Sequence, residues 1–259
     1  MSEISRGVVP CGVMDSWLVK NNSSSRRSAH LFLILVHFID NIMSEPIITY
    51  SAMNIGKAIP YDRSEFYNEE IARCKLWKKP DRYIEVVHIF LFNEHGEIII
   101  QKRSREKRHN PNLLDKSIGG HMQNGDTPNL TAMIETIQEL HTPSIVLNSH
   151  SDFMRTYGVL KEYISTSALL EYIDSIDLIS EKIIDDTIIS IGNRVHTYFW
   201  IYSGRVKNID KEAKWILFYS LDELEWELDK NPEIFTNDLR KAIWRYAESM
   251  RYFLSEIWI

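Results

Sequence analysis

The chain has 259 residues, 44% of them hydrophobic, which is enough for one large domain with extensions and for a packed core. Its 36 Asp and Glu residues outnumber its 30 Lys and Arg residues, and the formal net charge of -6 argues against a nucleic-acid partner, because no global basic field exists. Only two cysteines occur and neither belongs to a CxxC pair, which disfavours a disulfide framework or thiolate zinc site and favours a reducing, cytoplasmic compartment.

The first 45 residues differ in character from the rest of the chain. Residues 1–28 are polar and lack periodicity, which is typical of a disordered segment. Residues 29–40 are strongly apolar, but their continuous apolar run covers only residues 31–36, far short of the roughly 20 residues that a membrane-spanning helix needs. No small-residue cleavage site follows. We therefore expect residues 1–45 to be a partly disordered extension without a membrane anchor. Its apolar stretch is then a short docked helix, or lies upstream of a protein that begins at Met43.

From residue 46 the chain has the texture of an α/β domain. The first elements expected are a strand at residues 47–51, a turn at residues 54–56, and a helix at residues 64–76 capped by Ser64. A β-hairpin follows, with strands at residues 83–92 and 97–102 joined by the turn residues 93–96.

A helix is predicted at residues 127–140. Asp126 or Thr127 can cap it, Pro128 suits its first turn, and it should end near His141. Spacings of three and four indicate that one face is apolar and buried. The residues of this face are Leu130, Met133, Ile134, Ile137 and Leu140.

Two carboxylates four residues apart, Glu135 and Glu139, share a face of this helix, with Gln138 on the same flank. A solvated acidic surface would produce the same pair. The glycine pair Gly119-Gly120 in the preceding loop favours another interpretation, because carboxylates beside exposed backbone amides suit Mg²⁺ that bridges the phosphates of a substrate.

The later elements expected are three strands and three helices. They are a strand at residues 153–160, a helical insertion at residues 165–181, strands at residues 195–203 and 215–219, and closing helices at residues 222–228 and 236–254.

Residues 120–141, GHMQNGDTPNLTAMIETIQELH, resemble the Nudix box, in which a glycine, five residues, a glutamate and seven residues precede R-E-U-x-E-E-x-G. In this resemblance Gly120 takes the leading glycine, Asp126 the first acidic place, and Glu135 and Glu139 two of the glutamates. Further similarity, from about residue 47 to residue 246, is to the Nudix branch that includes isopentenyl diphosphate isomerase and its hydrolase relatives.

The resemblance implies a fold and a division of the chain. The fold is α/β, an α/β/α sandwich with a mixed β-sheet and helical extensions at both ends. Residues 46–249 would be the Nudix domain, with the insertion near residues 165–181, and residues 250–259 the end of a C-terminal helix.

Four positions depart from the box. Ile134 replaces the arginine that supports the glutamates, Gln138 replaces a glutamate that commonly binds metal, and His141 replaces the final glycine. Thr136 stands where an apolar residue is usual. An amide in place of a carboxylate should weaken Mg²⁺ binding and reduce activity.

The activity implied is metal-dependent hydrolysis of a diphosphate linkage in a nucleoside diphosphate derivative or a related small molecule. Glu135 and Glu139 would be catalytic and would hold Mg²⁺ or Mn²⁺ together with Gln138, while Glu212 would be an extra ligand or base, or a solvated loop residue. Substrate contacts are expected from a basic loop and from the glycine strand, although most such charge runs are solvated. The residues expected to bind substrate are Arg103, Lys107, Gly119, Gly120 and His121.

Two alternatives remain at this point. A catalytically weakened Nudix-fold binding module is one, suggested by the departures in the box. Isomerase activity is the other, but Gly119 stands where the isomerases carry a catalytic cysteine, and residues 192–194 lack their later glutamate.

Overall fold

A computed structural model describes residues 46–51, 54–75, 80, 82–204 and 213–257. The predicted N-terminal extension at residues 1–45 and the candidate ligand Glu212 lie outside these residues. Within the described part, no helix is both long and apolar enough to cross a membrane.

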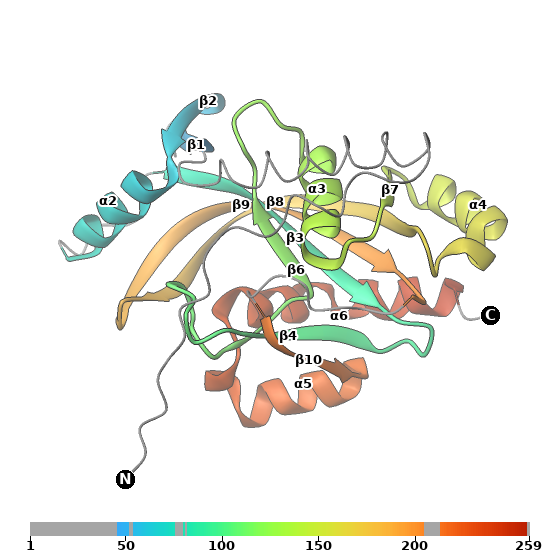
Figure 1. Ribbon diagram of the computed structural model, residues 1–259. Helices are drawn as coiled ribbons and strands as arrows, with labels where there is room; N and C mark the ends of the chain where they lie inside the picture. Colours follow the sequence, from blue (N-terminus) through green and yellow to red (C-terminus); the bar gives the residue numbers. More distant parts are fainter. Residues whose placement is uncertain (1–45, 52–53, 76–79, 81, 205–212, 258–259) are drawn as a thin grey trace, which may run out of the picture. The chain divides into compact units, whose positions relative to one another are not determined.

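The described strands belong to one mixed β-sheet (Figure 1). Its main order is β10-β4-β3-β9-β8-β7, in which β3 is parallel to β9 and β7 to β8, while β1 and β2 pair beside the start of β3. The strands are β1 (Pro46–Ser51), β2 (Asn54–Asp62), β3 (Arg82–Phe92), β4 (Ile98–Arg103), β5 (Leu114–Asp115), β6 (Ile118–His121), β7 (Ser144–Leu147), β8 (Ala168–Ile184), β9 (Thr187–Ile201) and β10 (Ala213–Tyr219).

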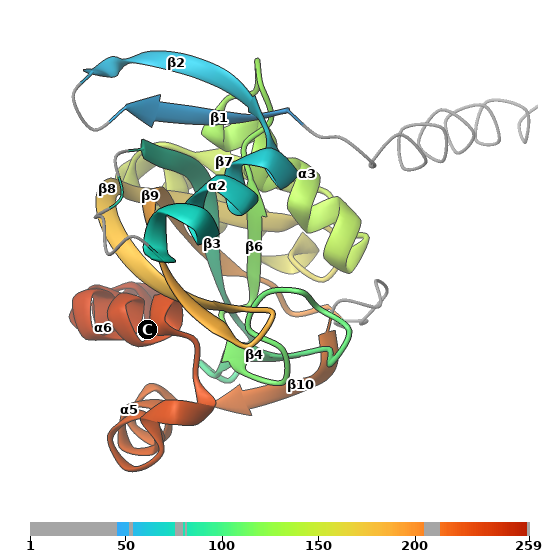
Figure 2. The ribbon, with the colours of Figure 1, turned by 90° about the vertical axis from the view of Figure 1, so that its left-hand side faces the viewer.

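Helices cover both faces of this sheet. The α-helices are α2 (Arg63–Lys75), α3 (Pro128–Leu140), α4 (His150–Leu160), α5 (Leu221–Lys230) and α6 (Asn237–Ile257), and two short 3₁₀ turns lie at Lys161–Tyr163 and Pro232–Ile234. Figures 1 and 2 show α3 and α6 on opposite sides of β3. The predicted α/β/α sandwich with a mixed sheet is therefore confirmed.

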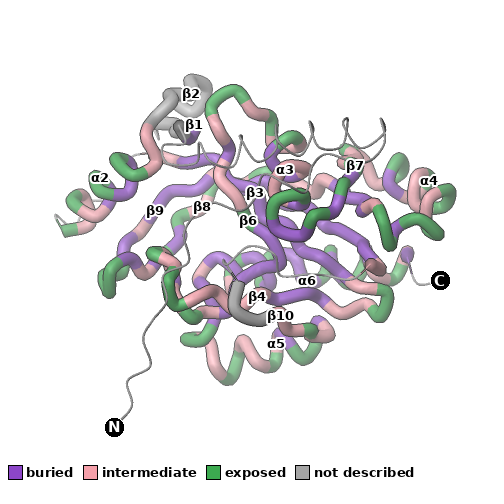
Figure 3. The backbone as a smooth tube through the Cα atoms, in the orientation of Figure 1, coloured by how far each residue is buried: buried purple, intermediate pink, exposed green. Residues whose placement is uncertain are grey.

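The alternation of side chains along β3 explains why both faces are covered. Val87 and Ile89 point into a core with Ala132 of α3, whereas Phe90 and Phe92 point into a second core with residues of α6. Because both sets are buried, β3 is an almost continuous apolar run, as expected of a central strand with a parallel neighbour. Figure 3 shows this central strand buried along most of its length.

The hairpin prediction is confirmed, and its turn is closed by Asn93. The Asn93 Oδ1 atom accepts hydrogen bonds from the backbone N–H groups of His95 (2.9 Å) and Glu97 (3.0 Å), and Gly96 takes a positive φ of 73°. The two closing helices and the strand at β10 are also where the sequence places them. The helix predicted to begin at Ser64 begins at Arg63, and the carboxylate of Asp62 accepts from the backbone N–H of Glu65.

Three predictions of secondary structure are wrong. The turn expected at residues 54–56 is part of β2, and the strand expected at residues 153–160 is α4. Ser149 caps α4 by accepting a hydrogen bond from the Asp152 backbone N–H, and this cap outweighs the β-branched and aromatic residues of the segment.

The helical insertion expected at residues 165–181 is the strand β8. Its Leu, Glu and Lys residues favour a helix locally, but pairing along nearly the full length of β9 overrides that preference. Asp185 and Asp186, with φ values of 48° and 61°, form a two-residue turn between the strands. Two consecutive aspartates between apolar runs were the missed signal, because such turns require positive φ at both central positions.

Candidate active site

Helix α3 carries the candidate site, and its two ends are set by local hydrogen bonds. Thr127, rather than Asp126, is the N-cap, and its hydroxyl accepts from the Leu130 backbone N–H at 3.2 Å. Pro128 lies in the first turn, where its missing N–H costs nothing. His141 ends the helix with φ 52° and ψ 32°, so it adopts the left-handed conformation for which glycine is the usual residue.

The buried face of α3 differs from the predicted apolar face. Leu130 and Ile137 are 44% and 38% exposed, and Ile134 is only half-buried. The helix buries instead a face of small and polar side chains, which lets it approach the sheet closely. Its members are Thr131, Ala132, Thr136, Glu139 and Leu140. Thr136, one of the departures from the box, is fully buried and satisfied, because its hydroxyl lies 2.9 Å from Ser144 Oγ and donates to the Met133 carbonyl.

Glu135 of α3 lies against Gly120 of β6. The carboxylate of Glu135 lies so close to the Gly120 Cα that any side chain at position 120 would overlap it. Gly120 therefore leaves room for the Glu135 carboxylate, which a Cβ at this position would displace. The strand β6 and the helix α3 contact each other through this pair.

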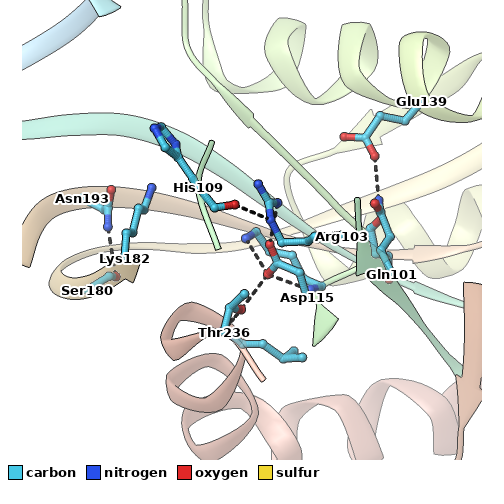
Figure 4. Close-up of polar contacts among 12 residues, drawn as sticks. Gln101, Arg103, His109, Asp115, Glu139, Ser180, Lys182, Asn193 and Thr236 are labelled. Atoms are coloured by element: carbon cyan, nitrogen blue, oxygen red, sulfur yellow. Dashed lines mark hydrogen bonds and ion pairs between the residues drawn. The ribbon is translucent and has the colours of Figure 1, made fainter. Parts of the chain in front are cut away.

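Glu139 is buried, and its position is fixed by a residue from β4 (Figure 4). The Gln101 amide donates to Glu139 Oε2 at 2.7 Å and also to the backbone carbonyl of Ser117. Gln101 was not among the predicted site residues. The available signal was its place in the segment similar to other Nudix proteins, not any motif of its own.

Lys116 occupies the space beside Gly119. A Cβ at position 119 would come within 2.5 Å of Lys116 Cε, on the opposite face of β6 from the Gly120–Glu135 contact. The Lys116 ammonium lies 3.2 Å from Asp115 Oδ1, and it is buried. The place of the isomerase cysteine is thus next to a lysine.

Asp115 is a hub of charged contacts. Besides Lys116 it binds the Arg103 guanidinium at 3.0 Å and accepts from the Thr236 hydroxyl at 2.8 Å. Burial raises the pKa of the Asp115 carboxyl, but the positive charges of Lys116 and Arg103 outweigh this effect and hold the pKa well below its usual range. Arg103 also donates to the His109 carbonyl at 3.0 Å, so it anchors the loop between β4 and β5. Lys107 lies in the same loop and is half-buried. A substrate contact for either residue stays a prediction.

His121 follows Gly120 and contacts α2. Its Nε2 lies 2.9 Å from the Tyr67 hydroxyl, and it is half-buried. Burial, with help from Arg63 and Lys182, holds the pKa of His121 well below its usual value, so the ring is neutral at pH 7.

The donor set of α3 fits a divalent cation only in part. Glu135 and Glu139 present two carboxylates, whereas Gln138 is exposed. Among the residues the structure describes, no group of three or more His, Cys, Asp or Glu side chains could hold a metal. Mg²⁺ is commonly bound by one or two carboxylates together with substrate phosphates and water, so the pair suits a shared site and not a closed protein cage.

The family model described as the NUDIX domain matches residues 82–177. An uncharacterized Nudix hydrolase from Listeria innocua is 37% identical over 68 residues, which are 26% of this chain and 40% of that protein. The isopentenyl-diphosphate Delta-isomerase of Streptomyces coelicolor is 34% identical over 68 residues, 26% of this chain and 34% of that one.

A crystal structure of a protein from Deinococcus radiodurans superposes with a TM-score of 0.45 at 18% identity, covering 62% of this chain and 82% of that one. The chain spans less than half the length of the Listeria and Streptomyces relatives that it matches. Over residues 82–177 the chain is therefore similar to the NUDIX domain and to Nudix hydrolases.

Proposed function

We propose that this protein hydrolyses a phosphoanhydride bond of a small-molecule diphosphate with the help of Mg²⁺ or Mn²⁺. The observation that supports it most directly is the contact between the Glu135 carboxylate and Gly120, one helical turn from the buried Glu139. This arrangement presents two carboxylates beside the open backbone of β6. Similarity to the NUDIX domain supports action on diphosphates in general, and a nucleoside diphosphate derivative is the candidate substrate.

Each residue has a distinct part in this proposal. Glu135 and Glu139 would hold the cation, which when bound polarises a phosphoryl oxygen and lowers the pKa of a water. Gln101 orients the Glu139 carboxylate through its 2.7 Å hydrogen bond. Glu139 also accepts the proton of the attacking water, because a general base must lie beside the water that it activates. The absence of an anionic group at Gln138 predicts weak affinity for the cation and a requirement for high metal concentrations.

The test is a hydrolysis screen over nucleoside triphosphates, nucleotide sugars, dinucleotides and prenyl diphosphates with each metal. Glu139→Gln should reduce kcat at least a hundredfold, because proton transfer by a positioned group contributes about 10²–10⁴-fold. Glu248→Gln, which changes an exposed glutamate on α6, is the matched control and should retain full activity. Turnover that survives Glu139→Gln would refute the assignment.

A second candidate function is a Nudix-fold binding module without catalysis. The observation that favours it is the box itself, in which Ile134 and Gln138 take the places of an arginine and a glutamate. This module would show a ligand-dependent rise in melting temperature and no turnover with either metal. Isomerase activity is disfavoured, because Lys116 packs where the cysteine of those enzymes would project.

A further inference from the structure

Strands β3 and β4 separate soon after their hairpin, and Ser117 lies where they part. Among the described residues their ladder holds the single pair Phe92–Ile98, and β4 then pairs with β5 and β10 instead. The Ser117 hydroxyl joins the two strands again, because it donates to the Ile99 carbonyl at 2.5 Å and accepts from the Leu91 backbone N–H at 2.8 Å. Ser117 is only 2% exposed, and buried backbone groups without a partner are costly. The backbone of two neighbouring strands therefore fixes Ser117.

Gln101 of β4 connects this fixed point with Glu139 of α3. Its amide nitrogen donates to the backbone carbonyl of Ser117 and, at 2.7 Å, to Glu139 Oε2. A backbone carbonyl and an ionised carboxylate only accept, so the nitrogen of the amide must face them and both of its N–H groups are used. Figure 4 shows the Gln101 side chain reaching from β4 toward Glu139. Because the last torsion of a glutamate is broad, a hydrogen bond to one oxygen sets the direction of the whole carboxylate.

Helix α3 does not supply this support from within. The resemblance to the Nudix box puts an arginine at position 134, whereas Ile134 carries no hydrogen-bond donor. One helical turn before Glu139, the Glu135 carboxylate rests against Gly120. The helix thus meets β6 at two carboxylates, and the direction of the second one is set by the sheet.

We infer that Gln101 and Ser117 are positioning residues that hold Glu139 in the direction in which it binds a divalent cation. This support from the sheet takes the place of the arginine that Ile134 replaces. The inference rests on the proposed function, in which Glu139 is a metal ligand. Groups that orient a metal ligand typically change metal affinity about 10–100-fold when they are removed. Loss of the Gln101 donor should therefore weaken cation binding while the fold stays intact.

The experiment measures Mn²⁺ binding without substrate, from the electron paramagnetic resonance signal of the free ion. Gln101→Met has nearly the same shape without a donor, and it should weaken binding about tenfold to a hundredfold. Gln101→Leu is a second donor-free variant, so the failure of one variant to fold leaves the test intact. Ser117→Ala should weaken binding less, because the bond from Gln101 to Glu139 remains. Asn148→Leu is the matched control, since it removes an exposed amide that accepts from Asn129 near the other end of α3, and it should bind as the wild type does.

Turnover gives a second readout that separates positioning from a structural role. In Gln101→Met the Mn²⁺ concentration for half-maximal activity should rise by the same factor as the dissociation constant. The KM for the substrate at saturating Mn²⁺ should change little. Circular dichroism at the assay temperature establishes that each variant is folded. A structural role would instead lower the melting temperature and leave the Mn²⁺ affinity of the folded protein unchanged.

Two results overturn the inference. One is wild-type affinity for Mn²⁺ in the folded Gln101 variants, and the other is an equal loss of affinity in Asn148→Leu. The two proposals can also fail separately. Mn²⁺ binding that depends on Gln101, without turnover of any diphosphate, would remove only the hydrolase function. Turnover that depends on Glu139 but keeps the wild-type metal requirement in Gln101→Met would remove only the positioning role.

Discussion

Acidification should destabilise the folded chain through His88 on β3. This side chain is 4% exposed, and burial together with Lys116 lowers its pKa to about 3. In the unfolded chain a histidine has a pKa of about 6.5. Below that pH the unfolded state takes up a proton that the folded state does not, so stability is lost as the pH falls from 6.5 toward 3. Between pH 7 and pH 5 the loss from His88 alone is about 2 kcal/mol.

Urea denaturation at pH 7 and pH 5 measures this loss. The wild type should lose more than the contribution of His88, because His109 and His121 also resist protonation when folded. His88→Leu should lose about 2 kcal/mol less than the wild type over the same interval, since leucine does not titrate. Carboxylates with a raised pKa, Asp126 and Glu171, are present in both proteins, so their contributions cancel in the comparison. An equal loss in both proteins would show that His88 is protonated in the folded state.

Two substitutions test the ends of the box. His141→Gly should raise the free energy of unfolding, measured by urea denaturation, by up to about 1 kcal/mol. The left-handed conformation at φ 52° strains any residue with a Cβ. A lower free energy of unfolding would mean that the imidazole makes contacts that outweigh this strain. Gly120→Ala should displace the Glu135 carboxylate and lower kcat/KM at least tenfold while the melting temperature changes little, since the far end of a flexible side chain gives way. Gly158→Ala on α4, where nothing lies within 4 Å, is its control, and it should keep full activity and gain stability.

The sequence predicted the elements whose local signals agree with their tertiary setting. The hairpin at Asn93 and the two ends of helix α3 belong to this group, because the turn residues and the capping residues agree with the tertiary setting. The long hairpin of β8 and β9 does not, since leucine and glutamate in β8 favour a helix and only pairing with a distant strand decides the outcome. Periodicity on α3 also misled, because Thr136 and Glu139 are buried while Leu130 faces solvent.

In the candidate site, the residues of the spaced motif could be named from the sequence. Residues that matter only through contacts across the fold could not. The spacing of the box named Gly120 and Glu135, which the structure brings into contact. No motif of its own marks Gln101, because its importance arises from Glu139, 38 positions further along the chain. Glu139 therefore could be named from the sequence, but not the amide that orients it.

The glycine pair of β6 also limits how this scaffold could be redesigned. Gly119→Cys alone would not recreate an isomerase centre, because the new thiol would collide with the Lys116 stem, which is held by the Asp115 carboxylate. Lys116 would have to move, and Asp115 would then keep Arg103 as its cationic partner. A side chain at position 119 and the Lys116–Asp115 pair therefore compete for the same space on this strand.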